Sequence, residues 1–342
     1  MKKIIILSLL SLSAFAQNRI QLKHDEAGKR VEVTVDGKPF TAYIYPGPAE
    51  LKKPVLFPIQ TASGNFITRG WPMNPRPGER IDHPHHVGMW FNYGNANGHD
   101  FWNNSTDIDK SHGGPFGTVV HTGVQSMKSG KDKAELVVTA AWLDKDDKPM
   151  LRERTTFVFR GEGSQRTIDR ITTLTTLDKE VVFKDNKEGM VAIRVARELE
   201  HPSNKPEVFT DANGVATKVP AMASAGITGK YHSSEGVEGE AVWGKRAKWM
   251  NLTGIVNGEN VSVLMLDHPQ NVGYPTYWHS RGYGLYAANP LAPAVFTNNK
   301  EAAMNYTLGA GKSVTFQYRV VITSGAIDAD RVDEQNRAFL GK

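Results

Sequence analysis

The sequence predicts an all-β protein, built as a large antiparallel β-sandwich with a short C-terminal helix. Three observations predict this fold class: apolar and polar residues alternate with period two in many segments, turn sequences separate those segments, and helical periodicity is scarce. An alternating segment buries one face and leaves the other to solvent, as an antiparallel sheet allows. We therefore expect hairpins packed face to face in two layers.

The alternating segments are spread along the whole chain. The clearest are Arg19 to Lys23, Arg30 to Val35, Ala134 to Thr139, Arg154 to Phe159 and Ser313 to Ile322. Turn signals stand between such segments at Asp36-Gly37, Asp144 to Pro149, Gly161 to Gly163 and Asn257-Gly258. These sequences favour hairpins that join antiparallel neighbours. From Ile327 to Leu340, acidic residues in the first turn and apolar residues beyond predict the C-terminal helix.

The first sixteen residues have the pattern of a secretory signal. Lys2 and Lys3 precede an apolar run, and small residues end at Ala16, before Gln17. We expect cleavage after Ala16, so that residues 1–16 are a signal peptide and residues 17–342 form one β-sandwich domain. The chain has no cysteine, which excludes disulfides and a lipid anchor on cysteine. The expected location is the periplasm or the extracellular medium.

The rest of the composition excludes several classes of partner and chemistry. The formal charge of +5 falls to +3 without Lys2 and Lys3, and no block of five basic residues occurs, so we do not expect nucleic acid as a partner. After the signal, no stretch approaches the ~20 apolar residues of a membrane helix. Phosphate loops, dinucleotide-binding glycines and a Gly-x-Ser-x-Gly elbow are absent. The sequence does not predict an oligomeric state.

Three long irregular stretches, 58–86, 94–116 and 267–300, are predicted to be functional loops because they are rich in aromatic residues. Residues 82–102 alone hold four of the 11 histidines and two of the seven tryptophans. Their opening pattern, Asp-His-Pro-x-x-Val-Gly, returns at residues 267–273 and again precedes an aromatic cluster. We expect the two distant stretches to line one pocket.

The histidines of the first stretch are the candidate catalytic residues. His83 and His85 are two residues apart, so in an extended segment they point to the same face, and His86 points away. This spacing suits acid/base chemistry, and it also suits a metal site in which His279 would join His83 and His85. Glu188, between a turn and an apolar strand, is the candidate carboxylate.

Other residue types in these stretches are suited to holding a polar ring. Arginine forks bind hydroxyls or carboxylates, indole faces stack on sugars, and histidine and amide groups form hydrogen bonds. The candidate substrate-binding residues are Arg69, Arg80, Trp90, Asn97, Trp102, Arg194, Trp278, His279 and Arg281.

Several of these motifs carry a resemblance to a known family. They are Arg69 to Pro72, Glu79 to His86, Asn97 to Trp102, Lys187 to Gly189, Trp243 to Ala247 and Ala288 to Pro290. The chain resembles a bacterial family of exported proteins labelled PmoA or "methane oxygenase", a domain of unknown function. The label is not a mechanism, because the methane monooxygenase subunit of that name is an integral membrane protein.

The resemblance implies a role in carbohydrate use and a fold similar to the galactose-mutarotase-like supersandwich. Mutarotases use a histidine acid and a glutamate base at the anomeric carbon. The resemblance therefore implies an analogous role for His83 or His86 together with Glu188.

The leading prediction is a carbohydrate-active enzyme in which His83, His85 or His86 moves a proton on a sugar or sugar acid. Glu188 would be the second acid/base group, and no cofactor would be required. Epimerase, lyase and hydrolase reactions stay open. Two alternatives also stay open: an enzyme with a divalent metal at the His-x-His segment, and a sugar-binding protein without catalysis.

Overall fold

The computed structural model of the chain describes residues 19–108, 113–203, 205–211, 213, 215–219 and 226–341. The predicted signal peptide and its cleavage site lie outside these residues. Export therefore stays a prediction of the sequence.

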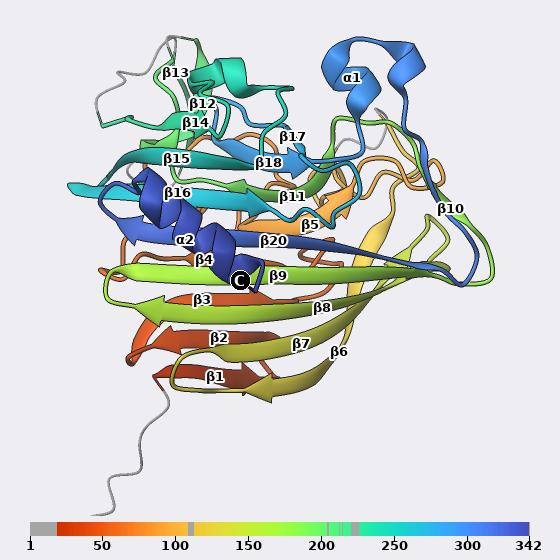
Figure 1. Ribbon diagram of the computed structural model, residues 1–342, viewed down its shortest axis with the longest axis horizontal. Helices are drawn as coiled ribbons and strands as arrows, with labels where there is room; N and C mark the ends of the chain where they lie inside the picture. The colour runs from red at the N-terminus through yellow and green to blue at the C-terminus, as the bar shows by residue number, and fades with distance from the viewer. Residues whose placement is uncertain are drawn as a thin grey trace, which may run out of the picture.

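Two eight-stranded antiparallel sheets face each other across one hydrophobic core (Figure 1). The first sheet contains, in spatial order, β1 (Ile20–Asp25), β2 (Arg30–Val35), β3 (Lys38–Ile44), β4 (Val55–Ile59), β5 (Met89–Tyr93), β11 (Gly189–Arg194), β18 (Leu285–Asn289) and β17 (Tyr277–Trp278). The second contains β14 (Lys230–Ser233), β15 (Trp249–Val256), β16 (Glu259–Asp267), β20 (Ser313–Ser324), β9 (Gln165–Thr176), β8 (Pro149–Glu162), β7 (Ala134–Leu143) and β6 (Thr118–Lys128). Two small ribbons complete the fold. One pairs β10 (Val181–Phe183) with β19 (Tyr306–Leu308), and the other pairs β12 (Glu207–Thr210) with β13 (Ala216–Val219). The predicted all-β sandwich is confirmed.

Period-two alternation explains how these strands form the core. In β2, Val31, Val33 and Val35 are buried, and the residues between them face outward. A fully buried valine stabilises the fold by about 1.5–3 kcal/mol relative to an exposed one, so a register slip by one residue would lose this gain from the whole strand.

The helices are short. They are α1 (Pro293–Thr297), α2 (Ala329–Phe339) and the 3₁₀ turns η1 (Arg197–Leu199), η2 (Gly239–Val242) and η3 (Lys300–Ala302). The carboxylate of Asp328 caps α2 by accepting from the backbone N–H of Arg331 at 2.8 Å. Val332 and Phe339 of this predicted helix pack on the outer face of the second sheet. The stretch 267–300, predicted to be irregular, contains β17, β18 and α1, because its short strands extend the edge of the first sheet.

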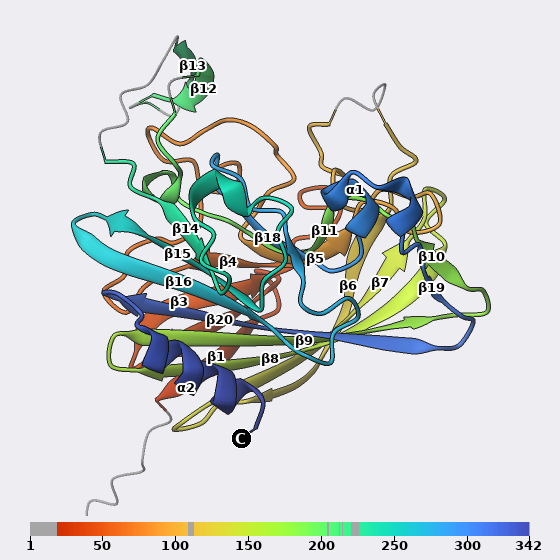
Figure 2. The ribbon, with the colours of Figure 1, turned by 45° about the horizontal axis from the view of Figure 1, so that its top comes forward.

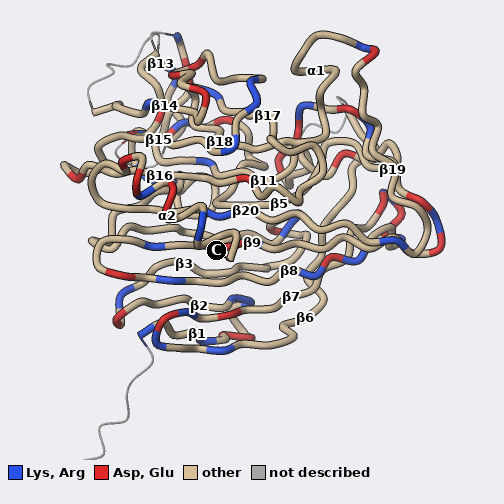
Figure 3. Tube along the Cα trace, in the orientation of Figure 1, with Lys and Arg blue, Asp and Glu red and all other residues tan. Residues whose placement is uncertain are grey.

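The outer face of the first sheet carries a separate apolar cluster and positions the candidate site. The cluster contains Trp90, Ala192 and Ala287 from the strands and Trp102 from a loop. Figure 2 shows α1, β12–β13 and the long loops gathered at the top of the view, away from α2. Charges of both signs are interspersed along the trace in Figure 3. Within the described residues, no helix combines the length and apolarity needed to cross a bilayer.

Candidate functional site

Strand register places a row of residues across the outer face of the first sheet. Trp90 of β5 pairs with Ala192 of β11, and Ala192 pairs with Ala287 of β18. The backbone N–H of His279 then donates to the carbonyl of Ala287 at 2.8 Å. The Trp102 ring contacts both ends of the row, with centroids 5.1 Å from Trp90 and 6.5 Å from His279. The two small alanines therefore leave room for an aromatic layer above the sheet.

The histidine loop next to this row is fixed by a buried arginine. The guanidinium of Arg69 is only 1% exposed. It donates to the carbonyls of Arg80, Asp82, His83 and His86 over 2.9–3.2 Å. These contacts show that Arg69 holds the loop in place, and its role in substrate binding stays a prediction.

Asp82 is the electrostatic centre of the loop. Its Oδ1 atom accepts from Arg69 at 2.5 Å and from the fully buried Arg194 at 2.7 Å. Its Oδ2 atom lies 3.1 Å from Nδ1 of His83. Burial raises the pKa of this carboxyl, but the charge of Arg194, the hydrogen bond with His83 and the charge of Arg69 outweigh burial and hold the pKa well below its usual range. Asp82 is therefore a fixed carboxylate that orients the ring of His83.

His83 is the exposed member of the loop, with 40% of its side chain accessible. Its ring is parallel to those of His86 and Tyr283, at centroid distances of 4.7 and 4.9 Å. Its backbone φ is +45°, in the left-handed region that non-glycine residues rarely adopt. Such strained residues cluster at functional sites. The bond to Asp82 occupies Nδ1, and Nε2 makes no hydrogen bond with the described residues.

His86 lies beneath His83 and is buried. Arg194 faces its Nδ1 at 3.3 Å, and because arginine is only a donor, Nδ1 accepts and the proton sits on Nε2. Burial, and then the charge of His85, keep the pKa of His86 well below its usual range, which is consistent with this neutral form. Nε2 of His86 and the indole nitrogens of Trp90 and Trp102 are buried N–H donors without a partner among the described residues. A layer of unpaired donors therefore underlies the exposed ring.

A buried lysine adjoins this layer. Lys53 is 2% exposed, donates to the carbonyl of His85 at 2.7 Å and lies 5.4 Å from the centroid of the Trp90 ring. Burial lowers its pKa to about 7, and the charge of Asp100 opposes this only in part. Burial and the charge of Lys53 in turn keep the pKa of His85 well below normal.

Glu188 pairs with His279 on the other side of Trp102. A carboxylate oxygen of Glu188 lies 3.8 Å from Nδ1 of His279, which also approaches the carbonyl of Lys187 at 2.7 Å. The ammonium of Lys187 contacts the same carboxylate. The amide of Asn289 donates to the carbonyl of Lys187 at 2.9 Å and holds this turn. A Cβ atom on Gly94 would approach that of Glu188 to 2.7 Å, so only glycine fits there.

His279 is an uncharged imidazole at neutral pH. Burial lowers its pKa to about 4, although the charge of Glu188 acts in the opposite direction. The side chain of Glu188 is 15% exposed, whereas that of His279 is 3% exposed and covered.

Two predicted substrate-binding residues have structural contacts instead. Trp278 points into the core between the sheets, where its indole N–H donates to the carbonyl of Ala247 at 3.1 Å. It is adjacent to His279 in the sequence and therefore faces the opposite side of the sheet. The amide of Asn97 is exposed and binds the backbone of Glu180 and Val182, which ties its turn to β10. Neither side chain contacts the histidine loop.

Arg80 is also committed to ion pairs, with Glu200 and Glu207, both at 2.6 Å. It lines a cavity of about 450 Å³ together with His201 and Tyr283. Because Tyr283 stacks on His83, this cavity adjoins the exposed histidine.

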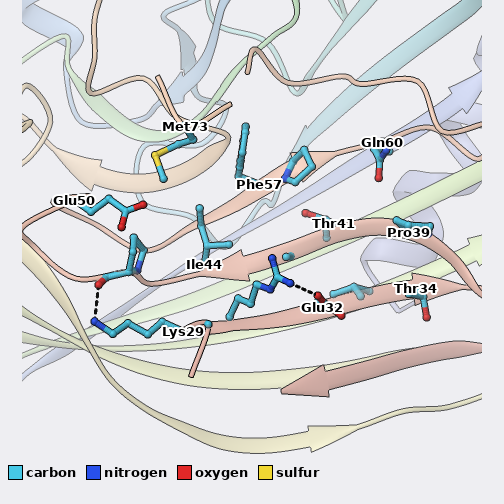
Figure 4. A pocket seen from close by; sticks show the side chains of 16 residues that line it. Lys29, Glu32, Thr34, Pro39, Thr41, Ile44, Glu50, Phe57, Gln60 and Met73 are labelled. Atoms are coloured by element: carbon cyan, nitrogen blue, oxygen red, sulfur yellow. Dashed lines mark hydrogen bonds and ion pairs between the residues drawn. The ribbon is translucent and has the colours of Figure 1, made fainter. Parts of the chain in front are cut away.

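Another cavity, of about 440 Å³, lies on the same sheet face over β2, β3 and β4 (Figure 4). Ile44, Phe57 and Met73 form its apolar part, and its charges include the exposed ion pair of Arg30 with Glu32 at 2.7 Å. No histidine lines it. The candidate catalytic histidines lie at the histidine loop, outside this cavity.

The structure does not assemble the metal site considered as an alternative. Within the described ranges, no group of three or more His, Asp or Glu side chains could hold a metal ion. The rings of His83 and His85 lie 5.7 Å apart, and no contact connects His279 to either of them.

Four residues near the site are not among the predicted site residues: Asp82, Tyr283, Lys53 and Trp243, whose ring lies 6.5 Å from that of His279. Asp82 directly precedes His83, and that adjacency was a usable signal. Tyr283 and Trp243 lie in clusters with an aromatic-rich composition, but nothing local singles them out. Lys53 gives no sequence signal, because only folding buries it.

Comparisons with known proteins give one family match and three distantly similar solved structures. Residues 30–337 match the model of a "Family of unknown function (DUF6807)". No curated protein matches the chain. The galactosidase domain of an alpha-galactosidase-sucrose kinase is 8% identical, with a TM-score of 0.41 over 92% of this chain and 43% of that one, so this chain spans less than half of its length.

Two smaller proteins are similar over nearly their whole length. A galactose mutarotase-like protein from Clostridium acetobutylicum is 13% identical, with a TM-score of 0.38 over 90% of this chain and 98% of that one. A galactose 1-epimerase from Lactobacillus acidophilus is 11% identical, with a TM-score of 0.35 over 91% and 100% of the two chains. Because these TM-scores are low, the chemistry of the site rests on its own residues.

Proposed function

The chain belongs to the DUF6807 family, whose function is unknown, and from the geometry of its site we propose that it is a carbohydrate-active enzyme in which His83 moves a proton on a sugar. The observation that carries this proposal is the Asp82–His83 pair. Asp82 binds Nδ1 of His83 and is itself fixed by two buried arginines. The ring is thus oriented, with Nε2 left to act as general acid or base.

Glu188 is the proposed second acid/base group. It is 15% exposed, and its charge acts on Tyr283, whose ring stacks on His83. Glu188 pairs with His279, whose ring is parallel to that of Trp102, and Trp102 in turn lies 5.8 Å from the ring of His86 beneath His83. Two such groups are what epimerisation, elimination and hydrolysis of a sugar each require.

The aromatic surroundings support a sugar as the substrate. Tyr283 and Trp243 are partly exposed aromatic side chains, the residue type that packs on the apolar face of a pyranose. The cavity of about 450 Å³ that begins at Tyr283 is large enough for a monosaccharide.

The proposal is tested by incubating the protein with aldoses, keto-sugars and uronates in D₂O. NMR would follow deuterium incorporation, anomeric exchange and product release. His83→Gln should slow the responding reaction about 100-fold to 10,000-fold, the usual contribution of a positioned acid/base group. His232→Gln is the matched control, because His232 also has Nδ1 near a carboxylate, at 3.2 Å from Glu238, on an exposed surface. Equal rates for His83→Gln and wild type would overturn the proposal.

A sugar-binding role without catalysis is the alternative outcome of this experiment. Saturable sugar binding with no isotope exchange and no product would establish it. The proposed proton transfer does not depend on the PmoA label of the resembling sequences.

We also propose that the protein acts in the periplasm or outside the cell. The support is the signal pattern of residues 1–16. Cell fractionation and the mass of the mature N-terminus test it, with Gln17 expected as the first residue.

A further inference from the structure

Arg281 differs from the other arginines of the site in having no carboxylate or carbonyl partner among the described residues. Arg69 and Arg194 share Asp82, and Arg80 binds Glu200. The half-buried guanidinium of Arg281 instead lies 4.4 Å from the centroid of the Trp243 ring. Its five N–H donors therefore have no acceptor within the described part of the chain.

The stacking of Arg281 on Trp243 prepares a planar fork for binding. A guanidinium held flat against an indole loses little freedom when it binds a carboxylate through two parallel hydrogen bonds. The indole nitrogen of Trp243 is itself a buried donor without a partner among the described residues. Buried polar groups are normally satisfied, so this N–H beside an arginine fork that lacks an acceptor points to an anionic ligand.

The position of Arg281 connects this pair of donors to the proposed acid/base groups. After burial, which is the main cause, the charge of Arg281 contributes to the lowered pKa of His279. It also acts on Tyr283, whose ring lies 4.9 Å from that of His83. The Trp243 ring that Arg281 covers lies 6.5 Å from the ring of His279, which pairs with Glu188, so an anion at Arg281 would lie next to that pair.

We propose that Arg281 and Trp243 anchor the carboxylate of the substrate, which is therefore a sugar acid such as a uronate. This inference rests on the proposed function and names its substrate class. A neutral sugar offers only hydroxyls to a half-buried guanidinium, whereas a carboxylate neutralises it and accepts both of its parallel donors.

Arg246 supplies a matched control on the same side of the molecule. Its guanidinium lies 5.3 Å from the centroid of the Tyr277 ring, so it makes a comparable cation–π contact. Its donors, however, bind the carbonyls of Pro275 at 2.8 Å, Tyr274 at 2.9 Å and Gly273 at 3.2 Å. Arg246→Met removes an arginine from an aromatic face without removing unpaired donors.

Calorimetry in a His83→Gln background, which slows turnover, tests the inference. The probes are D-galacturonate and D-glucuronate, their neutral counterparts D-galactose and D-glucose, and acetate and inorganic phosphate as simple anions. We expect a uronate to bind about tenfold or more tightly than its neutral counterpart, the value of a charge-assisted hydrogen bond. Arg281→Met should abolish this preference, Arg281→Lys should reduce it, and Arg246→Met should retain it. Circular dichroism melts verify that each variant is folded.

Three results would overturn the inference: equal affinity for acidic and neutral sugars, a preference that survives Arg281→Met, or acetate or phosphate binding as tightly as the uronate. Wild-type turnover of neutral sugars only, lost in His83→Gln, would overturn the inference and leave the proposed function standing. Uronate binding that depends on Arg281, with no turnover of any sugar, would support the inference and overturn the proposed function.

Discussion

The tripeptide Asp-His-Pro occurs twice in this chain, and its two copies have opposite electrostatic environments. In the first, Asp82 accepts from Arg69 and Arg194, which hold its pKa low although burial acts to raise it. In the second, Asp267 accepts from the amide of Asn271 at 2.7 Å and the backbone N–H of Thr276 at 2.8 Å. No ion pair compensates it among the described residues, and burial raises its pKa to about 7.

The histidines of the two copies differ in the same way. His83 is 40% exposed and is oriented by its aspartate. His268 is 8% exposed, its Nδ1 accepts from the backbone N–H of Gln270 at 3.2 Å, and its ring packs on Phe339 of α2. The second copy therefore lies at the outer face of the second sheet. The two stretches meet through residues further along the second one, such as His279 and Tyr283, whereas its Asp-His-Pro copy packs against α2.

The largest expected effect is on activity, and it separates the two histidines. His83→Gln should lower the rate of the proposed proton transfer about 100-fold to 10,000-fold. His268→Gln should leave the rate unchanged, because its ring contacts only structural groups. The D₂O assay measures both rates, and an equal loss in the two variants would contradict the difference in role.

The next largest effect is on stability, and it tests whether Asp82 depends on its ion pair with the buried Arg194. Arg194→Met leaves a partly buried carboxylate with one cation instead of two, and it leaves His86 without its donor. Breaking a buried pair typically costs about 3–5 kcal/mol in the free energy of unfolding. Urea denaturation measures this loss, and Arg331→Met, which removes an exposed ion pair with Glu334, should cost no more than about 1 kcal/mol. A similar small loss in both variants would show that Asp82 does not need its buried partner.

This comparison also shows how much the sequence could predict. Local alternation was sufficient for the sandwich, and Arg30–Val35 forms a strand with the expected bounds. The site depends on contacts that no local pattern contains, because Arg194 meets Asp82 across 112 residues. Within an aromatic run, adjacent residues face opposite sides of a strand, so Trp278 enters the core and His279 enters the site. Composition identified the stretch but could not assign its faces.

A further difference is that the first copy lies near the buried Lys53, which has no ion-pair partner among the described residues. Lys53→Met should stabilise the protein at pH 7 by about 1–4 kcal/mol, as often follows when a buried charge is replaced by an apolar side chain. Since burial lowers the pKa of Lys53 to about 7, the unfolded chain binds more protons between pH 7 and about 10.4. Wild-type stability then rises with pH in that window, and the gain from Lys53→Met should shrink.

Lys248→Met, an exposed control, should change stability by less than about 0.5 kcal/mol in thermal and urea unfolding. Destabilisation by Lys53→Met at pH 7 would contradict this account.

The smallest expected effects are opposite pH dependences of stability for the two aspartates. The folded pKa of Asp267 is about 7 and the unfolded value about 3.9, so the folded state binds more protons between these values and stability falls as pH rises from 4 to 7. The folded pKa of Asp82 is lowered, so its contribution is present above about pH 4 and is lost as pH falls further. Asp267→Asn should reduce the fall in stability between pH 4 and pH 7, which we call the Asp267 limb. Asp82→Asn should reduce the loss of stability below about pH 4, the Asp82 limb. Each slope should change by at most about 1.4 kcal/mol per pH unit. Urea unfolding from pH 2 to pH 8 follows the Asp267 limb and the upper part of the Asp82 limb. If both variants flattened the same limb, the arginines would not be what distinguishes the two copies.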